Sequence, residues 1–129
     1  MALVHLLVAL TLLQLIYFAL LVGKARDTYG VQAPATSGHE IFERYYRVQM
    51  NTLELLMVLL PSTWLAAQYL APGWVALLCA IYLIGRFIYL RAYVADPGKR
   101  SLGFTLSFVP ALILLLAGLI GSTLSLING

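Results

Sequence analysis

Three polar side chains lie at helical spacing inside a stretch that is otherwise apolar. Arg47, Asn51 and Glu54 follow one another at intervals of four and three residues in ERYYRVQMNTLELL. At about 100° per residue, they share an arc of about 60° on one helix face. A carboxylate within a membrane span costs about 2.5–3.5 kcal/mol on insertion scales, so it needs a partner or a wet cavity. Two interpretations stay open: a network in which Asn51 bridges Arg47 and Glu54 within the helix, and a polar cavity that opens to the cytoplasm.

A second polar stripe follows in LCAIYLIGRFIYLRAYVADPGKR. Spacings of four, three and four place its members within an arc of about 60°; they are Tyr82, Arg86, Tyr89 and Tyr93. Tyrosines near helix ends are also common interfacial anchors. Arg91 lies about 140° from Arg86, so it is expected to reach the interface instead. Arg100 follows a DPG turn at the start of the next helical stretch.

The two stripes together could form a binding site at the cytoplasmic end of a helix bundle. Arginine recognises carboxylates with a bidentate fork, and Glu54 could hold an ammonium group. The set therefore suits a small zwitterionic ligand that has free carboxylates and an amino group. His5 and His39 are isolated and have no partners at metal-ligand spacing, so no metal is expected. The candidate site residues are Arg47, Asn51, Glu54, Arg86, Tyr89, Tyr93 and Arg100.

The composition predicts the class of protein that carries these residues. Hydrophobic residues make up 62% of the 129 residues and charged residues only 10%, against about 25% charged in soluble domains. An integral membrane protein is therefore expected. The net charge of +3 comes from few, scattered basic residues, which excludes a nucleic-acid partner. Cys79 lies within an apolar run and is expected to be a small core residue.

The apolar runs predict four membrane spans in a single transmembrane domain, residues 1–129. Since a helix needs about 20 apolar residues to cross a bilayer, the spans are expected at about 2–23, 48–70, 74–95 and 104–127. With their polar leading turns, the helices are expected at about 2–23, 40–70, 74–95 and 102–127. The second and third are joined by an APGW turn. The first lacks a basic start and a cleavage site, so a retained span rather than a signal peptide is expected.

The basic residues predict the orientation of the chain. All of them border the first and third connections, and none lies in the APGW turn or at the termini. By the positive-inside rule, those two connections are cytoplasmic and both termini face the periplasm or lumen. The basic residues are Lys24, Arg26, Arg44, Arg47, Arg86, Arg91, Lys99 and Arg100. Some of them, such as Lys24, Arg44 and Lys99, could simply reach the interface from helix ends.

The same residues carry a family resemblance over most of the chain. FERYYRVQMNTLE resembles the pattern FERxYRxQxNxxE, and GRFIYLRAYVADPGKR resembles R-x-x-Y-x-x-x-Y followed seven residues later by Arg. Both patterns are typical of the membrane-associated proteins in eicosanoid and glutathione metabolism (MAPEG), which include microsomal glutathione transferases and leukotriene C synthase. The resemblance implies an all-α, integral membrane four-helix bundle that assembles as a homotrimer and binds glutathione between neighbouring subunits.

The resemblance also implies roles for individual residues. The seven candidate residues would contact glutathione from one subunit, and Arg26 and Gln49 would reach it from the next. Arg100 would be the catalytic residue that stabilises the glutathione thiolate. Gln49 lies about 200° from Arg47 on the same helix, which suits a pocket shared by two copies. The sequence departs from the synthase branch at Leu55, where that branch has Tyr, and at Arg26–Asp27, where it has paired arginines.

The sequence leaves three functions open. The expected function is a membrane-bound glutathione S-transferase for detoxification that conjugates hydrophobic electrophilic or lipid substrates, with glutathione peroxidase activity left open. The alternative is a non-catalytic membrane protein that binds glutathione or lipid. A carrier that uses Glu54 is the third, and the lack of internal symmetry argues against it, since many carriers are built from repeats.

Overall fold

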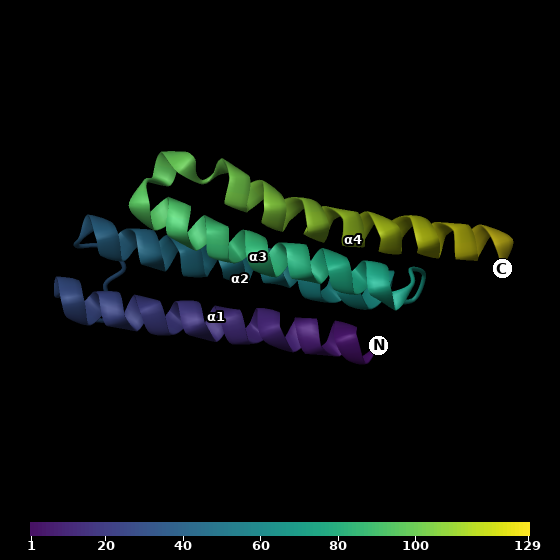
Figure 1. Ribbon diagram of the computed structural model, residues 1–129, viewed down its shortest axis with the longest axis horizontal. Helices are drawn as coiled ribbons and strands as arrows, with labels where there is room; N and C mark the ends of the chain where they lie inside the picture. The colour runs from purple at the N-terminus through teal and green to yellow at the C-terminus, as the bar shows by residue number, and fades with distance from the viewer.

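The computed structural model describes all 129 residues as four long helices in up-down order (Figure 1). The predicted all-α architecture is therefore confirmed. Consecutive helices are antiparallel, so the end of α1 and the start of α2 lie at the same end of the bundle as the α3–α4 turn. The elements are α1 (Ala2–Tyr29), α2 (Glu40–Ala66), α3 (Pro72–Ala95), a short 3₁₀ helix η1 (Pro97–Lys99) and α4 (Ser101–Asn128).

Three of the helices, α1, α3 and α4, are long and apolar enough to cross a membrane. The fourth predicted span lies in α2, whose composition falls short because its first half carries the polar stripe. Many large apolar side chains on α1 and α4 are exposed, which suits contact with lipid or with another chain. The core is packed mainly from α2, α3 and α4 side chains such as Leu56, Leu59, Tyr82 and Leu114.

Several helix ends differ from the expected positions because caps, not hydrophobicity, set them. α1 continues to Tyr29, past the expected end near residue 23, and stops where Gly30 adopts the left-handed conformation with φ 70°. α2 ends at Ala66 rather than near 70, since the backbone then closes into turns. Pro72 is the first residue of α3 instead of part of the turn, where its missing N–H costs no hydrogen bond. Pro61 lies inside the continuous α2.

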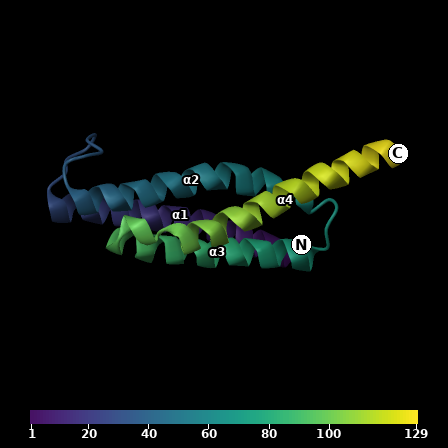
Figure 2. The same ribbon diagram turned by 90° about the horizontal axis from the view of Figure 1, so that it is seen from above.

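Two glycines allow α3 and α4 to approach closely. A Cβ on Gly103 would collide with the backbone of Tyr89, and one on Gly85 would lie 2.8 Å from the backbone of Leu106. Small residues are the usual means of bringing membrane helices together. From this contact α4 slants across α3 towards the end of α2, and its last turns extend beyond the other helices (Figure 2). The beginning of α4 is therefore held against the end of α3.

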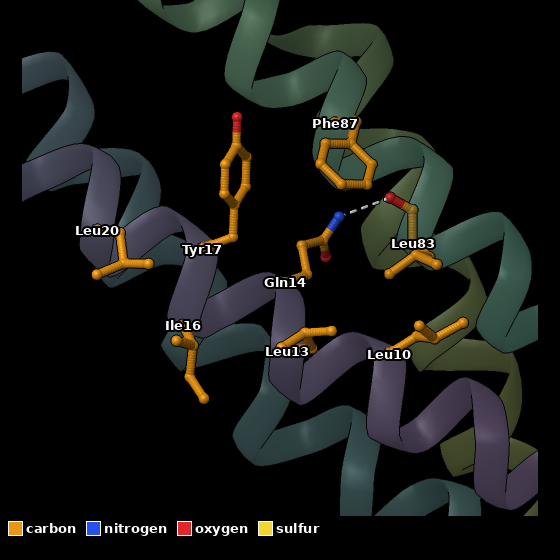
Figure 3. Close-up of a pocket in the computed structure, with 8 residues that line it drawn as sticks. All are labelled: Leu10, Leu13, Gln14, Ile16, Tyr17, Leu20, Leu83 and Phe87. Carbon is orange, nitrogen blue, oxygen red and sulfur yellow. Dashed lines mark hydrogen bonds between the residues drawn. The ribbon is translucent and has the colours of Figure 1, made fainter.

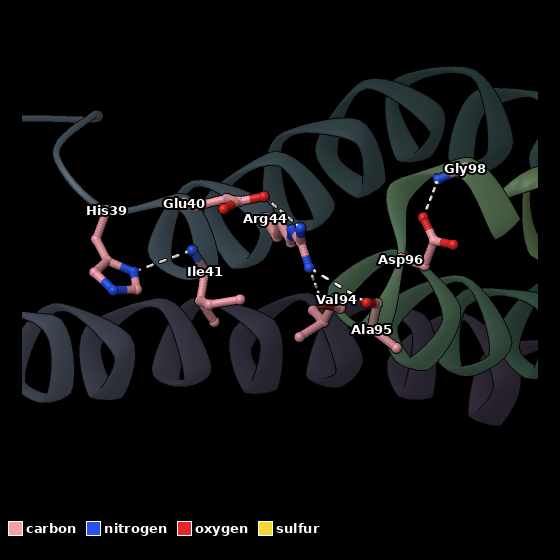
Figure 4. A network of polar contacts seen from close by, with 8 residues as sticks. All are labelled: His39, Glu40, Ile41, Arg44, Val94, Ala95, Asp96 and Gly98. Atoms are coloured by element: carbon pink, nitrogen blue, oxygen red, sulfur yellow. Dashed lines mark hydrogen bonds and ion pairs between the residues drawn. The ribbon is translucent and has the colours of Figure 1, made fainter.

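Side chains also tie the start of α2 to the end of α3 (Figure 4). Arg44 Nη1 donates to the carbonyl oxygens of Val94 at 2.9 Å and Ala95 at 3.3 Å. Its Nη2 pairs with Glu40 Oε1 at 2.6 Å. Arg44 therefore satisfies carbonyls at the C-terminal end of α3, where a cation is favourable. This contact fixes the relative position of the two helices that carry the polar stripes.

Candidate functional site

A polar cavity of about 360 Å³ lies where α2, α3 and α4 meet, at the end of the bundle that carries the α3–α4 turn. Five of the candidate residues line it together with one residue that was not predicted. No acidic side chain is among them, so the lining is cationic and aromatic. The lining residues are Arg47, Asn51, Tyr89, Tyr93, Arg100 and Phe104.

The aromatic wall of the cavity comes from α3. Tyr89 is only 3% exposed, and its ring is stacked on Tyr93 with 5.4 Å between the centroids. The guanidinium carbon of Arg86 also lies close to this ring, 4.3 Å from the Tyr89 ring centroid. A cation over an aromatic face is attracted by the ring quadrupole, so Arg86 and Tyr93 both restrict the orientation of Tyr89.

Arg86 is buried beside the cavity and does not line it. Its side chain has 0% exposure, and its Nε donates to Ser107 Oγ at 2.8 Å. Nη1 donates to Asn51 Oδ1 at 2.8 Å and to Thr52 Oγ1 at 3.1 Å. All these acceptors are neutral, so no carboxylate in the chain offsets the charge. Arg86 therefore joins α2, α3 and α4 and adds positive potential beside the cavity.

Arg100 reaches the cavity because of the turn that precedes it. Asp96 Oδ1 accepts the N–H of Gly98 at 3.0 Å, and the Asp96 carbonyl accepts the N–H of Lys99 at 2.9 Å. These bonds close η1 and reverse the chain. Arg100 is exposed and is the residue directly before α4. Its guanidinium thus adds to the partial positive charge of the α4 N-terminus.

Glu54 does not join the cavity. Arg47 and Glu54 are both exposed, and the chain's only ion pair is that between Arg44 and Glu40. Asn51 does not bridge the two, since its Oδ1 accepts from Arg86. The proposed network within the helix is therefore wrong. The expected convergence of Glu54 with the other polar residues does not occur within one chain.

Arg26 and Gln49, expected to act from a neighbouring subunit, also lie outside this cavity. Arg26 Nη1 donates to the Ala35 carbonyl at 2.6 Å, and its guanidinium carbon lies 4.8 Å from the Phe42 ring centroid. The connection between α1 and α2 thus holds the Arg26 side chain. Gln49 is half-buried on α2. Both are at the same end of the bundle as the cavity.

Comparison with known proteins defines the family. The model of the MAPEG family matches residues 4–120. The chain belongs to the MAPEG family. The resemblance inferred from the two sequence patterns is thereby confirmed.

Three relatives of this MAPEG protein cover most of its length. Microsomal glutathione S-transferase 2 of Homo sapiens is 38% identical over 105 residues, which make up 81% of this chain and 72% of the relative. Leukotriene C4 synthase of Bos taurus is 36% identical over 100 residues, 75% of this chain and 67% of the relative. An uncharacterized protein of a Synechocystis strain is 46% identical over 99 residues, 77% of this chain and 72% of the relative.

Three residues of the site in this MAPEG protein were not predicted. Phe104 lines the cavity, and Ser107 and Thr52 accept hydrogen bonds from Arg86. Phe104 and Ser107 lie four and seven residues after Arg100, so they share its helix face. That spacing was visible in the sequence. Thr52 gave no signal, because a threonine in an apolar helix commonly bonds its own backbone, as Thr52 also does to Val48.

Proposed function

We propose that this protein is a membrane-bound glutathione S-transferase that joins the glutathione thiolate to hydrophobic electrophiles. Membership of the MAPEG family and likeness to a glutathione S-transferase and a leukotriene C4 synthase support a membrane enzyme that uses glutathione. The observation that carries the proposal is the cavity between α2, α3 and α4, whose lining has two arginines and no acid.

The lining matches the functional groups of glutathione, which carries two carboxylates, an ammonium group and a thiol. Arg47 and Arg100 could each hold an anionic group through paired N–H donors. Asn51 and the hydroxyls of Tyr89 and Tyr93 supply further polar contacts. We assign Arg86 to positioning, since it is buried and acts through Asn51 and the Tyr89 ring.

A neighbouring subunit would complete the site. Glu54 is exposed on the same face of α2 as Arg47 and could bind the ammonium group at the rim. Arg26 and Gln49 of the next chain would reach the ligand from the other side. These placements and the family support our proposal of a homotrimer with shared sites. The exposed apolar surface along α2, including Met57 and Val58, is consistent with such a contact.

The chemical step requires a thiolate, because the thiol is a poor nucleophile. At neutral pH, a thiol with a pKa near the ordinary ~8.5 is mostly protonated. The Arg100 guanidinium would lower the pKa of the bound thiol, and each unit corresponds to about 1.4 kcal/mol of extra stabilisation of the thiolate. The thiol proton leaves to water. The sulfur then forms a bond to the electrophilic carbon, whose leaving group departs with its electron pair.

A hydrophobic second substrate would arrive from the bilayer. Exposed apolar side chains of α1 and α4 form the surface along which it could approach. Attack of the same thiolate on a lipid hydroperoxide oxygen would release the alcohol. A second glutathione would then reduce the resulting sulfenic species to give the disulfide and water, which is glutathione peroxidase chemistry.

The positions of the cations support a cytoplasmic site. The helix ends that carry the Lys and Arg residues all lie at one end of the bundle, and the termini lie at the other (Figure 1). By the positive-inside rule the cavity would face the cytoplasm, with both termini in the periplasm or lumen.

Arg100→Ala tests the proposal, and Lys99→Ala is the matched control. Lys99 is an adjacent exposed cation that does not line the cavity. Conjugation of a chromogenic electrophile and the thiolate absorbance of bound glutathione are measured on both purified variants. We expect Arg100→Ala to lower kcat/KM about 100-fold, equivalent to about 2.7 kcal/mol, and Lys99→Ala to retain activity.

Other outcomes would distinguish the alternatives. Unchanged turnover and thiolate absorbance in Arg100→Ala would remove its catalytic assignment. Saturable glutathione binding without turnover in the unaltered protein would indicate the non-catalytic alternative. Transport across liposomes that does not depend on glutathione would indicate a carrier.

A further inference from the structure

A groove runs along the seam between α1 and α3, and it shares no lining residue with the polar cavity. Two hollows of about 530 and 340 Å³ follow one another along it, and a third of about 190 Å³ continues them between α1 and Tyr45 of α2. The first and second share Tyr17, and the second and third share Leu21 and Tyr45. The hollows therefore form one continuous surface that leads towards the cation-bearing end of the bundle.

The larger hollow is apolar (Figure 3). Its floor is fixed by Gln14, which is 3% exposed and donates from Nε2 to the Leu83 carbonyl at 2.9 Å. Apolar side chains of both helices cover this polar contact. They are Leu10, Leu13, Ile16, Tyr17, Leu20, Leu83 and Phe87. The surface suits a hydrocarbon chain that lies parallel to the two helices.

The other two hollows carry cations. Arg91 lines the second and Lys24 lines the third, and both are exposed. Neither takes part in an ion pair. Asp27, one turn after Lys24 on α1, lines none of the three hollows. This end of the groove is therefore cationic. A neutral lipid headgroup would not need two cations beside it, whereas an anionic headgroup would.

The dimensions of the groove match one leaflet. Leu10 and Leu21 are eleven residues apart on α1, which corresponds to about 16 Å at 1.5 Å per residue. Half of a hydrocarbon core of about 30 Å is about 15 Å. An acyl chain that begins beside Leu21 would therefore end near Leu10, and its headgroup would lie level with Lys24 and Arg91.

We propose that this groove binds one anionic phospholipid of the leaflet on the cation-bearing side. An acyl chain lies along the α1–α3 seam, and the headgroup phosphate lies between Lys24 and Arg91. Basic pockets between membrane helices bind anionic headgroups in this manner. The headgroup end of this groove is separate from the proposed glutathione site, since neither cation lines the polar cavity.

The test compares lipid binding to the full chain and to Lys24→Gln/Arg91→Gln. Detergent-purified protein is titrated with phosphatidylglycerol or phosphatidylcholine of the same acyl chains, and bound lipid is counted by native mass spectrometry. We expect one retained phosphatidylglycerol per chain, with about tenfold weaker binding in the double variant. Lys99→Gln removes a charge on the same side but outside the groove, and it should bind as the unaltered chain does.

A second variant examines the apolar part. Leu20 is 67% exposed and lines the groove, so Leu20→Trp should fill the seam without disturbing the core. It should lower phosphatidylglycerol retention while its circular dichroism stays unchanged. Equal binding of the two lipids, displacement by inorganic phosphate alone, or a change of oligomeric state in place of lipid loss would each overturn the proposal.

Discussion

Arg86 is the only charged residue buried in the chain, and its place explains how three helices share one site. Its guanidinium reaches Asn51 on α2 and Ser107 on α4 from its own position on α3. Burying a cation without a carboxylate is costly, and Arg86 Nη2 also has no hydrogen-bond partner. The side chain is therefore better explained by the site that it supports than by the stability of the bundle.

Arg86→Met should separate these two roles. Methionine removes the cost of a buried charge that has no carboxylate partner, and Thr52 and Ser107 keep their own bonds to backbone carbonyls. We expect the thermal midpoint to stay within about 4 °C of the unaltered protein. Glutathione affinity should fall about tenfold, since Asn51 and Tyr89 lose the group that orients them. Calorimetry in detergent and equilibrium dialysis measure the two quantities.

Arg91→Met is the matched control for this prediction, because Arg91 lies on the same helix and outside the cavity. It should bind glutathione as the unaltered chain does. Normal glutathione binding by Arg86→Met would refute the positioning role. A loss of glutathione binding that only matched the fraction of unfolded protein would refute it as well.

At the scale of the helices, the site depends on the distance between α3 and α4. A Cβ on Gly103 would lie 2.8 Å from Tyr89 Cβ and closer still to its backbone. Gly103→Ala should therefore push α4 away from Tyr89 and carry Arg100 and Phe104 with it. We expect a loss of about 1–3 kcal/mol in stability, typical of overpacking, together with loss of glutathione binding.

Gly23→Ala is the control for the helix spacing. Gly23 is helical, and a Cβ there would meet nothing within 4 Å. Alanine should stabilise α1 by about 0.5–1 kcal/mol, because glycine loses more backbone freedom on folding. Resistance to unfolding in increasing sodium dodecyl sulfate measures both variants. Equal resistance to unfolding and equal glutathione binding in the two variants would show that the α3–α4 spacing does not limit the site.

The sequence predicted the helices and both polar stripes, because apolar runs and the 100° repeat depend on local spacing. The ends of α1 and α3 were missed, since Gly30 and Pro72 act through backbone conformation rather than hydropathy. The angular positions of residues around a helix also gave no information on how deeply each side chain is buried. Arg86 and Tyr89 share a stripe, yet one is fully buried behind the cavity and the other lines it.

For the whole molecule, a single chain leaves part of the expected site unassembled. Arg26 and Glu54 carry groups that suit a zwitterionic ligand, but neither lines the cavity of its own chain. The angular order of residues around a helix could not reveal this, because it says nothing about a second copy of the chain. A cyclic trimer would bring Arg26 of one chain towards the cavity of the next.

Co-expression of Arg26→Ala and Arg100→Ala chains, each with a different tag, tests whether the site is shared. Each variant alone should have little activity, because every one of its sites lacks one arginine. In a cyclic trimer that holds both variants, about one third of the sites would combine an intact Arg100 with an intact neighbouring Arg26. Trimers that retain both tags should therefore recover conjugation activity towards about one third of that of the unaltered protein. Mixing the two proteins after separate purification, without exchange of subunits, is the control and should recover none. Activity of mixed trimers no higher than the mean of the two variants would show that each chain works with its own Arg26 and Arg100, and the shared site would then be abandoned.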